Sequence, residues 1–260
     1  MNDRRLEKTV ELAATPEQVW DAIATGPGIS SWFVPHEVEP REGGAVGQRF
    51  GSGFDTTGRV TAWAPGRRFA YGVAEGDPAT HAFEFLIEGR DGGGTVLRFV
   101  QTGFSDEGWE EEYDSFDKGW DLFFGNLRSY LEHFAGQPVR NALAMGYTTG
   151  GASDIWPVLH SALGLTGHPA VGDEITLRPD GPEPVTGTVD VASPEFLGVR
   201  SAHGLHRIGA EGEAGCGVSA YHYFYGEPVD EAALTAAWQD WLTRLFPAPA
   251  EVGAPDTGQR

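Results

Sequence analysis

Hydrophobic and polar residues alternate along several stretches of the first half of the chain, and this period of two predicts β-strands. The first stretch is Leu6–Ala13. Five more follow, at Val46–Phe54, Gly58–Trp63, Arg68–Val73, His81–Glu88 and Thr95–Phe104. Glycine-rich and proline-containing segments between them are typical of turns, so these strands are expected to form one antiparallel sheet.

The alternation also indicates which face of the sheet each side chain occupies. Glu84, Glu88 and Arg98 are expected on the outer face, where unlike charges can pair across strands. The inner face is expected to carry Phe83, Phe85, Ile87, Leu97, Phe99 and Gln101. This predicts an unusually aromatic inner face with one polar amide in it.

A period of three to four residues predicts helices on either side of these strands. Thr15 is an N-cap, with Pro16 at the first helical position and Gln18 completing a capping box. Gly26-Pro27-Gly28 is expected to end this helix, and Ile29–Val34 to form a second short helical segment. A long helix is predicted from Trp109, with an apolar stripe of Phe116, Trp120, Phe123, Phe124, Leu127, Leu131 and Phe134.

The same order of elements begins again near residue 150. Ile155-Trp156 matches Val19-Trp20, and Ala237–Leu245 matches Gly119–Leu127. Strands are predicted between them and just before them, at Val139–Thr148, Glu174–Arg178, Val185–Val191, Phe196–Ser201, Leu205–Ala210 and Gly217–Tyr225. A repeat of this length predicts two tandem domains. We place them at residues 1–136 and 139–247, followed by a tail at 248–260 that is expected to be disordered.

The net negative charge of the chain argues against polyanionic binding partners. Residues 1–136 hold 12 Lys and Arg against 23 Asp and Glu, and residues 137–260 hold 6 against 15, so the halves carry −11 and −9. Neither half has the basic surface that nucleic acid or anionic lipid requires, so neither is expected as a partner. The absence of a long apolar run or signal-peptide core favours a cytoplasmic protein, and the Arg-, Gly- and Ala-rich composition favours a bacterial source.

No catalytic or metal-binding constellation stands out. The acidic stretch Asp106–Asp114 is explained by a helix N-terminus better than by a metal site. His203 and His206 are three apart in a predicted strand region, so with His222 they do not form a ligand set. Cys216, the single cysteine, is interpreted as a small buried residue rather than a reactive thiol. We therefore expect no cofactor and no metal.

The order of these features resembles a known superfamily. A first strand, Thr-Pro-x-x-Val-Trp at residues 15–20, Trp32 in the next helical segment, a meander and a closing Gly-Trp-x-x-x-Phe-x-x-Leu helix at residues 119–127 are similar to START-like (SRPBCC) helix-grip proteins. Within that superfamily the sequence most resembles the heat-shock protein 90 ATPase activator homologue family. The resemblance covers residues 6–134 and weakens over residues 139–246. It implies an α+β fold with two tandem helix-grip domains, the second degenerate, each a curved antiparallel sheet wrapped around a long C-terminal helix.

The resemblance also implies a cavity between sheet and helix, and the first domain is expected to carry it. The candidate ligand-binding residues are Trp32, Phe33, Phe54, Trp63, Tyr71, Phe83, Phe85, Phe99, Gln101, Trp120 and Phe124. Gln101 would need a hydrogen-bond partner if buried, and either a ligand or a neighbour such as Tyr71 or water could supply it.

Three functions stay open. The sequence favours non-catalytic binding of a small hydrophobic or aromatic molecule, in a carrier, sequestration or resistance role, because Glu84 and Glu88 are predicted to lie outside the cavity. A cyclase- or hydratase-type enzyme using the same cavity is the first alternative. A co-chaperone-like interaction module is the second, and the family resemblance alone suggests it; no residue pattern supports a protein partner.

Overall fold

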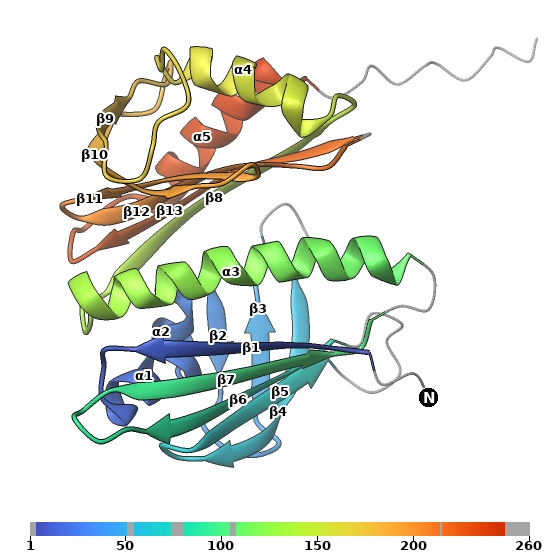
Figure 1. Cartoon of the computed structure of the whole chain (residues 1–260), viewed down its shortest axis with the longest axis vertical. Coiled ribbons are helices and arrows are strands. Elements are labelled where there is room, and N and C mark those ends of the chain that lie inside the picture. Colours follow the sequence, from blue (N-terminus) through green and yellow to red (C-terminus); the bar gives the residue numbers. More distant parts are fainter. Residues whose placement is uncertain (1–3, 51–54, 74–80, 105–107, 214, 248–260) are drawn as a thin grey trace, which may run out of the picture.

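The structure is a computed structural model, which describes residues 4–50, 55–73, 81–104, 108–213 and 215–247. Two antiparallel sheets organise it, and one long helix lies between them (Figure 1). Phe54 and the predicted tail at 248–260 lie outside the described residues. No described helix is long and apolar enough to cross a membrane.

The first sheet has seven strands in the order β1-β7-β6-β5-β4-β3-β2. Its strands are β1 (Arg5–Leu12), β2 (His36–Val38), β3 (Ala45–Gln48), β4 (Thr56–Ala64), β5 (Arg68–Val73), β6 (Ala82–Gly89) and β7 (Thr95–Thr102). The sheet is strongly bent, and in Figure 1 the directions of its strands change from β1 to β3. The predicted aromatic face is confirmed, because Phe83, Phe85 and Phe99 are buried and Glu88 is exposed.

The helices of the first half are α1 (Pro16–Ala24), α2 (Gly26–Ser30) and α3 (Trp109–His133). The predicted capping box is present: Gln18 N donates to Thr15 Oγ1 at 3.3 Å, and Thr15 N donates to Gln18 Oε1 at 2.9 Å. The helix starting at Trp109 is also confirmed. One boundary was wrong. Gly26-Pro27-Gly28 begins α2 rather than only ending α1, because Thr25 caps the new helix through Gly28 N and Pro27 fits its first turn.

The second sheet has six strands in the order β8-β13-β12-β11-β10-β9. Its strands are β8 (Val139–Thr148), β9 (Glu174–Leu177), β10 (Val185–Ala192), β11 (Phe196–Ser201), β12 (Gly204–Glu211) and β13 (Cys216–Tyr225). This is the first sheet's order without an equivalent of β2. A β-bulge also falls in the corresponding strand of each sheet, between Val60 and Ala62 in β4 and between Val189 and Val191 in β10. The tandem α+β helix-grip architecture is therefore confirmed.

Two helices cover the outer face of the second sheet, α4 (Ala152–Ala162) and α5 (Glu231–Leu245) (Figure 1). Trp238, Trp241 and Leu242 of α5 are buried there. The opening helix is less well capped than α1, because Gly151 offers no side-chain cap and Pro157 lies inside the helix. Residues 163–173, all of them described, contain no counterpart of α2, as the sequence predicted.

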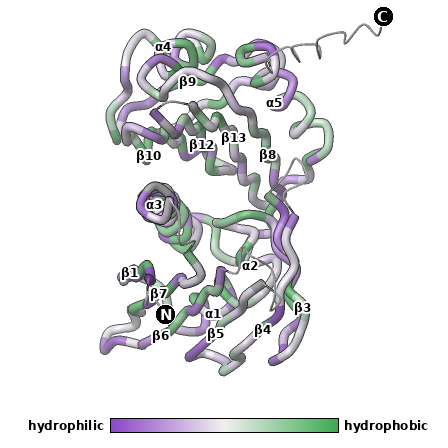
Figure 2. The backbone as a smooth tube through the Cα atoms, turned by 90° about the vertical axis from the view of Figure 1, so that its right-hand side faces the viewer, coloured by the Kyte–Doolittle hydropathy of each residue, from purple (hydrophilic) through white to green (hydrophobic). Residues whose placement is uncertain are grey.

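Helix α3 belongs to both halves of the molecule. Figure 2 shows it almost end-on, between the first sheet and the strands of the second. Trp120 and Phe124 pack on Phe99 of the first sheet. At the C-terminal end of the helix, its C-cap residue Phe134 stacks on Tyr225 of the second sheet, with ring centroids 4.2 Å apart. The second sheet is therefore covered on both faces, which explains why seven of the eight residues of β12 are buried.

Polar contacts also join the two halves. Arg207 is 1 % exposed; its guanidinium donates to both carboxylate oxygens of Asp190 at 2.8 Å and, through Nε, to Asn126 Oδ1 of α3 at 2.7 Å. Tyr225 Oη donates to the carbonyl of Ser31 at 2.6 Å. Asp190 of the same sheet neutralises the buried guanidinium, and the bond to Asn126 joins that sheet to α3. The bond of Tyr225 joins the second sheet to the end of α2.

The remaining sequence interpretations can be placed. Cys216 is fully buried, as predicted. His203 is exposed and His206 is buried, in agreement with their predicted opposite orientations. His206 Nδ1 lies 3.0 Å from Nδ1 of His222 across the β12–β13 ladder. The strand predicted at Val46–Phe54 ends at Gln48, and β2 was not predicted because three residues are too few for an alternation to register.

Candidate functional site

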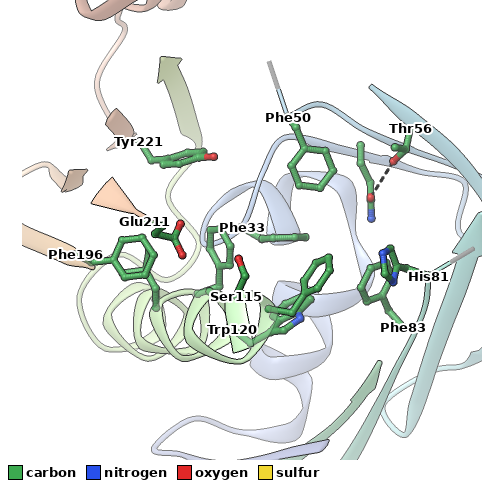
Figure 3. Close-up of a pocket in the computed structure, with 15 residues that line it drawn as sticks. Phe33, Phe50, Thr56, His81, Phe83, Ser115, Trp120, Phe196, Glu211 and Tyr221 are labelled. Carbon is green, nitrogen blue, oxygen red and sulfur yellow. Dashed lines mark hydrogen bonds between the residues drawn. The ribbon is translucent and has the colours of Figure 1, made fainter. Parts of the chain in front are cut away.

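An apolar cavity of about 270 Å³ lies beside α3, where the first sheet, α3 and the second sheet meet. Figure 3 shows its walls, with rings of Phe33, Phe83 and Trp120 facing the space. The lining residues are Phe33, Gln48, Phe50, Thr56, His81, Phe83, Ser115, Phe116, Gly119, Trp120, Leu122, Phe123, Phe196, Glu211 and Tyr221. Most of the wall is aromatic or aliphatic, which is typical of a site for a small organic molecule.

Helix α3 supplies the longest wall of the cavity. Its residues from Ser115 to Phe123 recur at helical spacing along one side. Gly119 has no side chain, and a Cβ at this position would meet no atom within 4 Å, so there is open space beside the helix here. The space beside Gly119 is therefore part of the cavity and would be filled by a larger side chain.

The polar groups at the first-domain end of the cavity bond to one another. Gln48 Nε2 donates to Tyr71 Oη at 3.0 Å. Thr56 Oγ1 donates to Gln48 Oε1 at 3.0 Å (Figure 3). His36 Nε2 lies 3.3 Å from Tyr71 Oη, and His36 Nδ1 lies 2.7 Å from the carbonyl of Val34. Burial lowers the pKa of His36 to about 4, so the ring is neutral near pH 7.

A second chain of hydrogen bonds runs through Gln101. Trp120 Nε1 can only donate, and it lies 2.5 Å from Gln101 Oε1, so the amide nitrogen of Gln101 faces His81 Nδ1 at 3.2 Å. His81 Nδ1 must then accept, which places the ring proton on Nε2, 3.4 Å from Glu112 Oε1. Burial lowers the pKa of His81, although Glu112 opposes this. Both ring nitrogens of His81 therefore have partners.

The second domain closes the other end with Phe196, Glu211 and Tyr221. In Figure 3 the Glu211 carboxyl group points from the second sheet toward Phe33 and α3. Burial and the charge of Glu195 raise the pKa of Glu211 to about 7, while Lys118 opposes the shift. Glu211 and Ser115 also border a wider, more polar cleft of about 1180 Å³. Glu211 therefore lies at the boundary between the apolar cavity and this cleft.

The structure divides the predicted site residues into two groups. Phe33, Phe83 and Trp120 line the cavity. The others described pack behind its walls or elsewhere in the core; they are Trp32, Trp63, Tyr71, Phe85, Phe99, Gln101 and Phe124. The first domain, which the sequence predicts to carry the cavity, supplies most of the lining residues, and the second domain contributes three.

Sequence reasoning missed several lining residues. His81 had a usable signal, because it precedes Phe83 by two residues and so shares its face of the strand. Phe116 and Phe123 were in the predicted stripe of α3 but were assigned to packing. No sequence pattern points to Glu211 and Tyr221 as cavity residues, because their position depends on how the two domains pack.

Comparison with known families agrees with the geometry of the first half. Residues 13–132 match the family described as activator of Hsp90 ATPase homolog 1-like protein. The first domain is similar to this family over these residues. The predicted superfamily resemblance is thereby confirmed, and the match spans the Aha1-like domain from the start of α1 almost to the end of α3. No curated protein matches the chain significantly in sequence.

Some solved structures are similar to about half of this chain, and others are similar to nearly all of it. Protein MLL2253 from Mesorhizobium loti has 25% identity and a TM-score of 0.45, covering 50% of this chain and 97% of its own. The di-domain ARO/CYC protein BexL has 14% identity and a TM-score of 0.45, covering 93% of this chain and 94% of its own. DynU16, a protein of the dynemicin biosynthetic locus, has 18% identity and a TM-score of 0.46, covering 94% and 96%.

Proposed function

We propose that this protein binds a small, mostly apolar molecule of about two aromatic rings in the cavity beside α3, without transforming it. The aromatic cavity itself is the observation that carries the proposal. Its volume of about 270 Å³ is roughly twice that of a cavity that holds benzene. Rings of Phe33, Phe83 and Trp120 provide edges and faces for stacking with such a ligand.

The hydrogen bonding of the first domain supports binding over catalysis. Gln48, Thr56 and His81 are held by neighbours, so they shape the wall and keep it apolar toward the cavity. A general base needs a free lone pair near its substrate, whereas the Nδ1 lone pair of His81 accepts from Gln101. A carrier or sequestration role requires only the cavity.

The test is titration of the full chain with 2-methoxynaphthalene, a two-ring probe, followed through the probe's own fluorescence. Gly119→Leu should fill the cavity and weaken binding at least about tenfold, because a ligand loses its place when the space is occupied. Gly125→Leu is the matched control, since Gly125 lies on the same helix, also has open space at Cβ and does not line the cavity. Equal binding by both variants would place the site elsewhere.

One observation favours a second function, an enzyme of the cyclase or hydratase type. A carboxyl group in an apolar cavity with a pKa of about 7, as at Glu211, suits proton transfer near neutral pH. Such a group could remove a proton next to a ketone. Catalysed hydrogen–deuterium exchange of 2-tetralone, measured by NMR in the intact protein and in Glu211→Gln, tests this alternative. Exchange no faster than in buffer would exclude it. A co-chaperone role stays a prediction of the family resemblance alone.

A further inference from the structure

The polar groups at the two ends of the cavity differ in their hydrogen bonding. At the first-domain end, Gln48, Thr56 and His81 each bond to a neighbouring side chain. At the second-domain end, the carboxyl group of Glu211 has no hydrogen-bond or ion-pair partner among the described residues. The Glu211 side chain is partly buried and also borders the polar cleft, so its carboxyl oxygens are available to accept a hydrogen bond from a ligand in the cavity.

Tyr221 presents a second acceptor at the same end. Its hydroxyl proton is directed at Met145 Sδ, 3.4 Å away, so the lone pairs of Tyr221 Oη are free to accept. The ring packs edge-on against Phe123 of α3, which fixes the direction of the side chain. Burial raises the pKa of Tyr221, and the charge of Glu211 adds to this shift, so the two groups act on each other electrostatically.

Other charged groups set the balance around Glu211. Lys118 of α3 lies toward it but is bound to Glu195, with Lys118 Nζ 2.8 Å from Glu195 Oε1. Asp114 of α3 and Glu213 after β12 line the same polar cleft, as do Tyr147, His160 and His168. Acidic groups therefore outnumber the single lysine around Glu211, and the site disfavours an anionic ligand.

We propose that Glu211 and Tyr221 of the second domain form the polar end of the cavity and accept a hydrogen bond from a hydroxyl or N–H group of the ligand. This inference rests on the proposed function and specifies the ligand class, a neutral or cationic aromatic molecule with a donor at one end. Its ring system lies among Phe33, Phe83 and Trp120. The second domain thus determines selectivity, while the first provides most of the apolar surface.

The experiment compares two probes of nearly equal size, 2-naphthol, which has a donor, and 2-methoxynaphthalene, which has none. The intact protein should bind 2-naphthol at least about tenfold more tightly, as expected for a hydrogen bond to a charged acceptor. The preference should increase between about pH 6 and about pH 8, because the carboxylate form accepts and the carboxylic acid competes as a donor. In Glu211→Met the preference should fall to about threefold or less, and Tyr221→Phe should give an intermediate value.

Glu195→Gln is the matched control, because Glu195 is a neighbouring carboxylate that does not line the cavity. It should keep the preference for 2-naphthol. It should also move the pH midpoint downward, since the charge of Glu195 raises the pKa of Glu211. Binding of 2-methoxynaphthalene by each variant shows that the cavity is intact.

The outcomes separate the two proposals. If both probes bind, Gly119→Leu blocks them and Glu211→Met leaves the preference unchanged, the role of Glu211 is overturned while the cavity remains the binding site. If neither probe binds the intact protein, the proposed function fails, and the selectivity argument fails with it.

Discussion

Trp120 on α3 and Gln101 on β7 are joined by a hydrogen bond of 2.5 Å from the indole Nε1 to Oε1, and both side chains are almost completely buried. This contact answers the question that the sequence left open about the partner of Gln101. The amide bonds to Trp120 and His81 rather than to Tyr71, so it orients two cavity-lining residues without lining the cavity itself.

Replacing Gln101 should therefore destabilise the fold rather than merely alter ligand choice. Gln101→Leu leaves the buried indole N–H without an acceptor and should lower the free energy of unfolding by about 1–3 kcal/mol. Urea denaturation of this variant, of Trp120→Phe and of the double variant forms a cycle that isolates the pair. Strictly additive costs would mean that the hydrogen bond contributes nothing.

Truncation of Trp120 should be among the most damaging single changes in the first domain. The ring contacts Phe33, Phe83, Phe99 and Phe124, and it is 2 % exposed. Trp120→Ala should cost about 3–5 kcal/mol in chemical denaturation, as large aromatic truncations in cores do. A loss below about 1 kcal/mol would show that α3 is not packed on the sheet at this position.

Glu211 should make stability depend on pH in the opposite sense to most carboxylates. Its pKa in the folded state, about 7, exceeds the ordinary value of 4.5, so the folded state binds more protons between these limits. Stability should fall as pH rises through this window. Relative to the wild type, Glu211→Gln should gain roughly 2–3 kcal/mol at about pH 8 and little at about pH 4.5. Denaturation at both pH values checks this, and a pH-independent difference would contradict the shift.

The Arg207 network should stabilise the second sheet and its contact with α3. Arg207→Met leaves Asp190 and Asn126 without their donor and should cost about 3–5 kcal/mol, the typical loss when one partner of a buried pair is removed. Arg140→Met is the control, because Arg140 is exposed and its ion pair with Glu231 is long, with 4.0 Å between Nη1 and Oε2. It should change the free energy of unfolding by less than about 1 kcal/mol. Similar losses in both variants would show that burial of the pair does not matter.

Most of the strands, the capped first helix and the repeat can be predicted from the sequence. Alternation fixes the faces of β6 and β7 because side chains point to opposite sides at every residue, whatever the strand packs against. The box of Thr15 and Gln18 is equally local, since both bonds close within one turn. Repetition of this order in the sequence predicts two domains of the same architecture.

Tertiary structure alone decided where α3 lies and what completes the cavity. The stripe of α3 shows that the helix has an apolar surface. Because the hydrophobic effect is not directional, the stripe does not show which elements will cover that surface. Only the packed structure places α3 between two sheets and brings Glu211 and Tyr221 beside Phe33 and Trp120. The pKa of Glu211 has the same origin, because desolvation and the charge of Glu195 arise from neighbours that chain folding assembles.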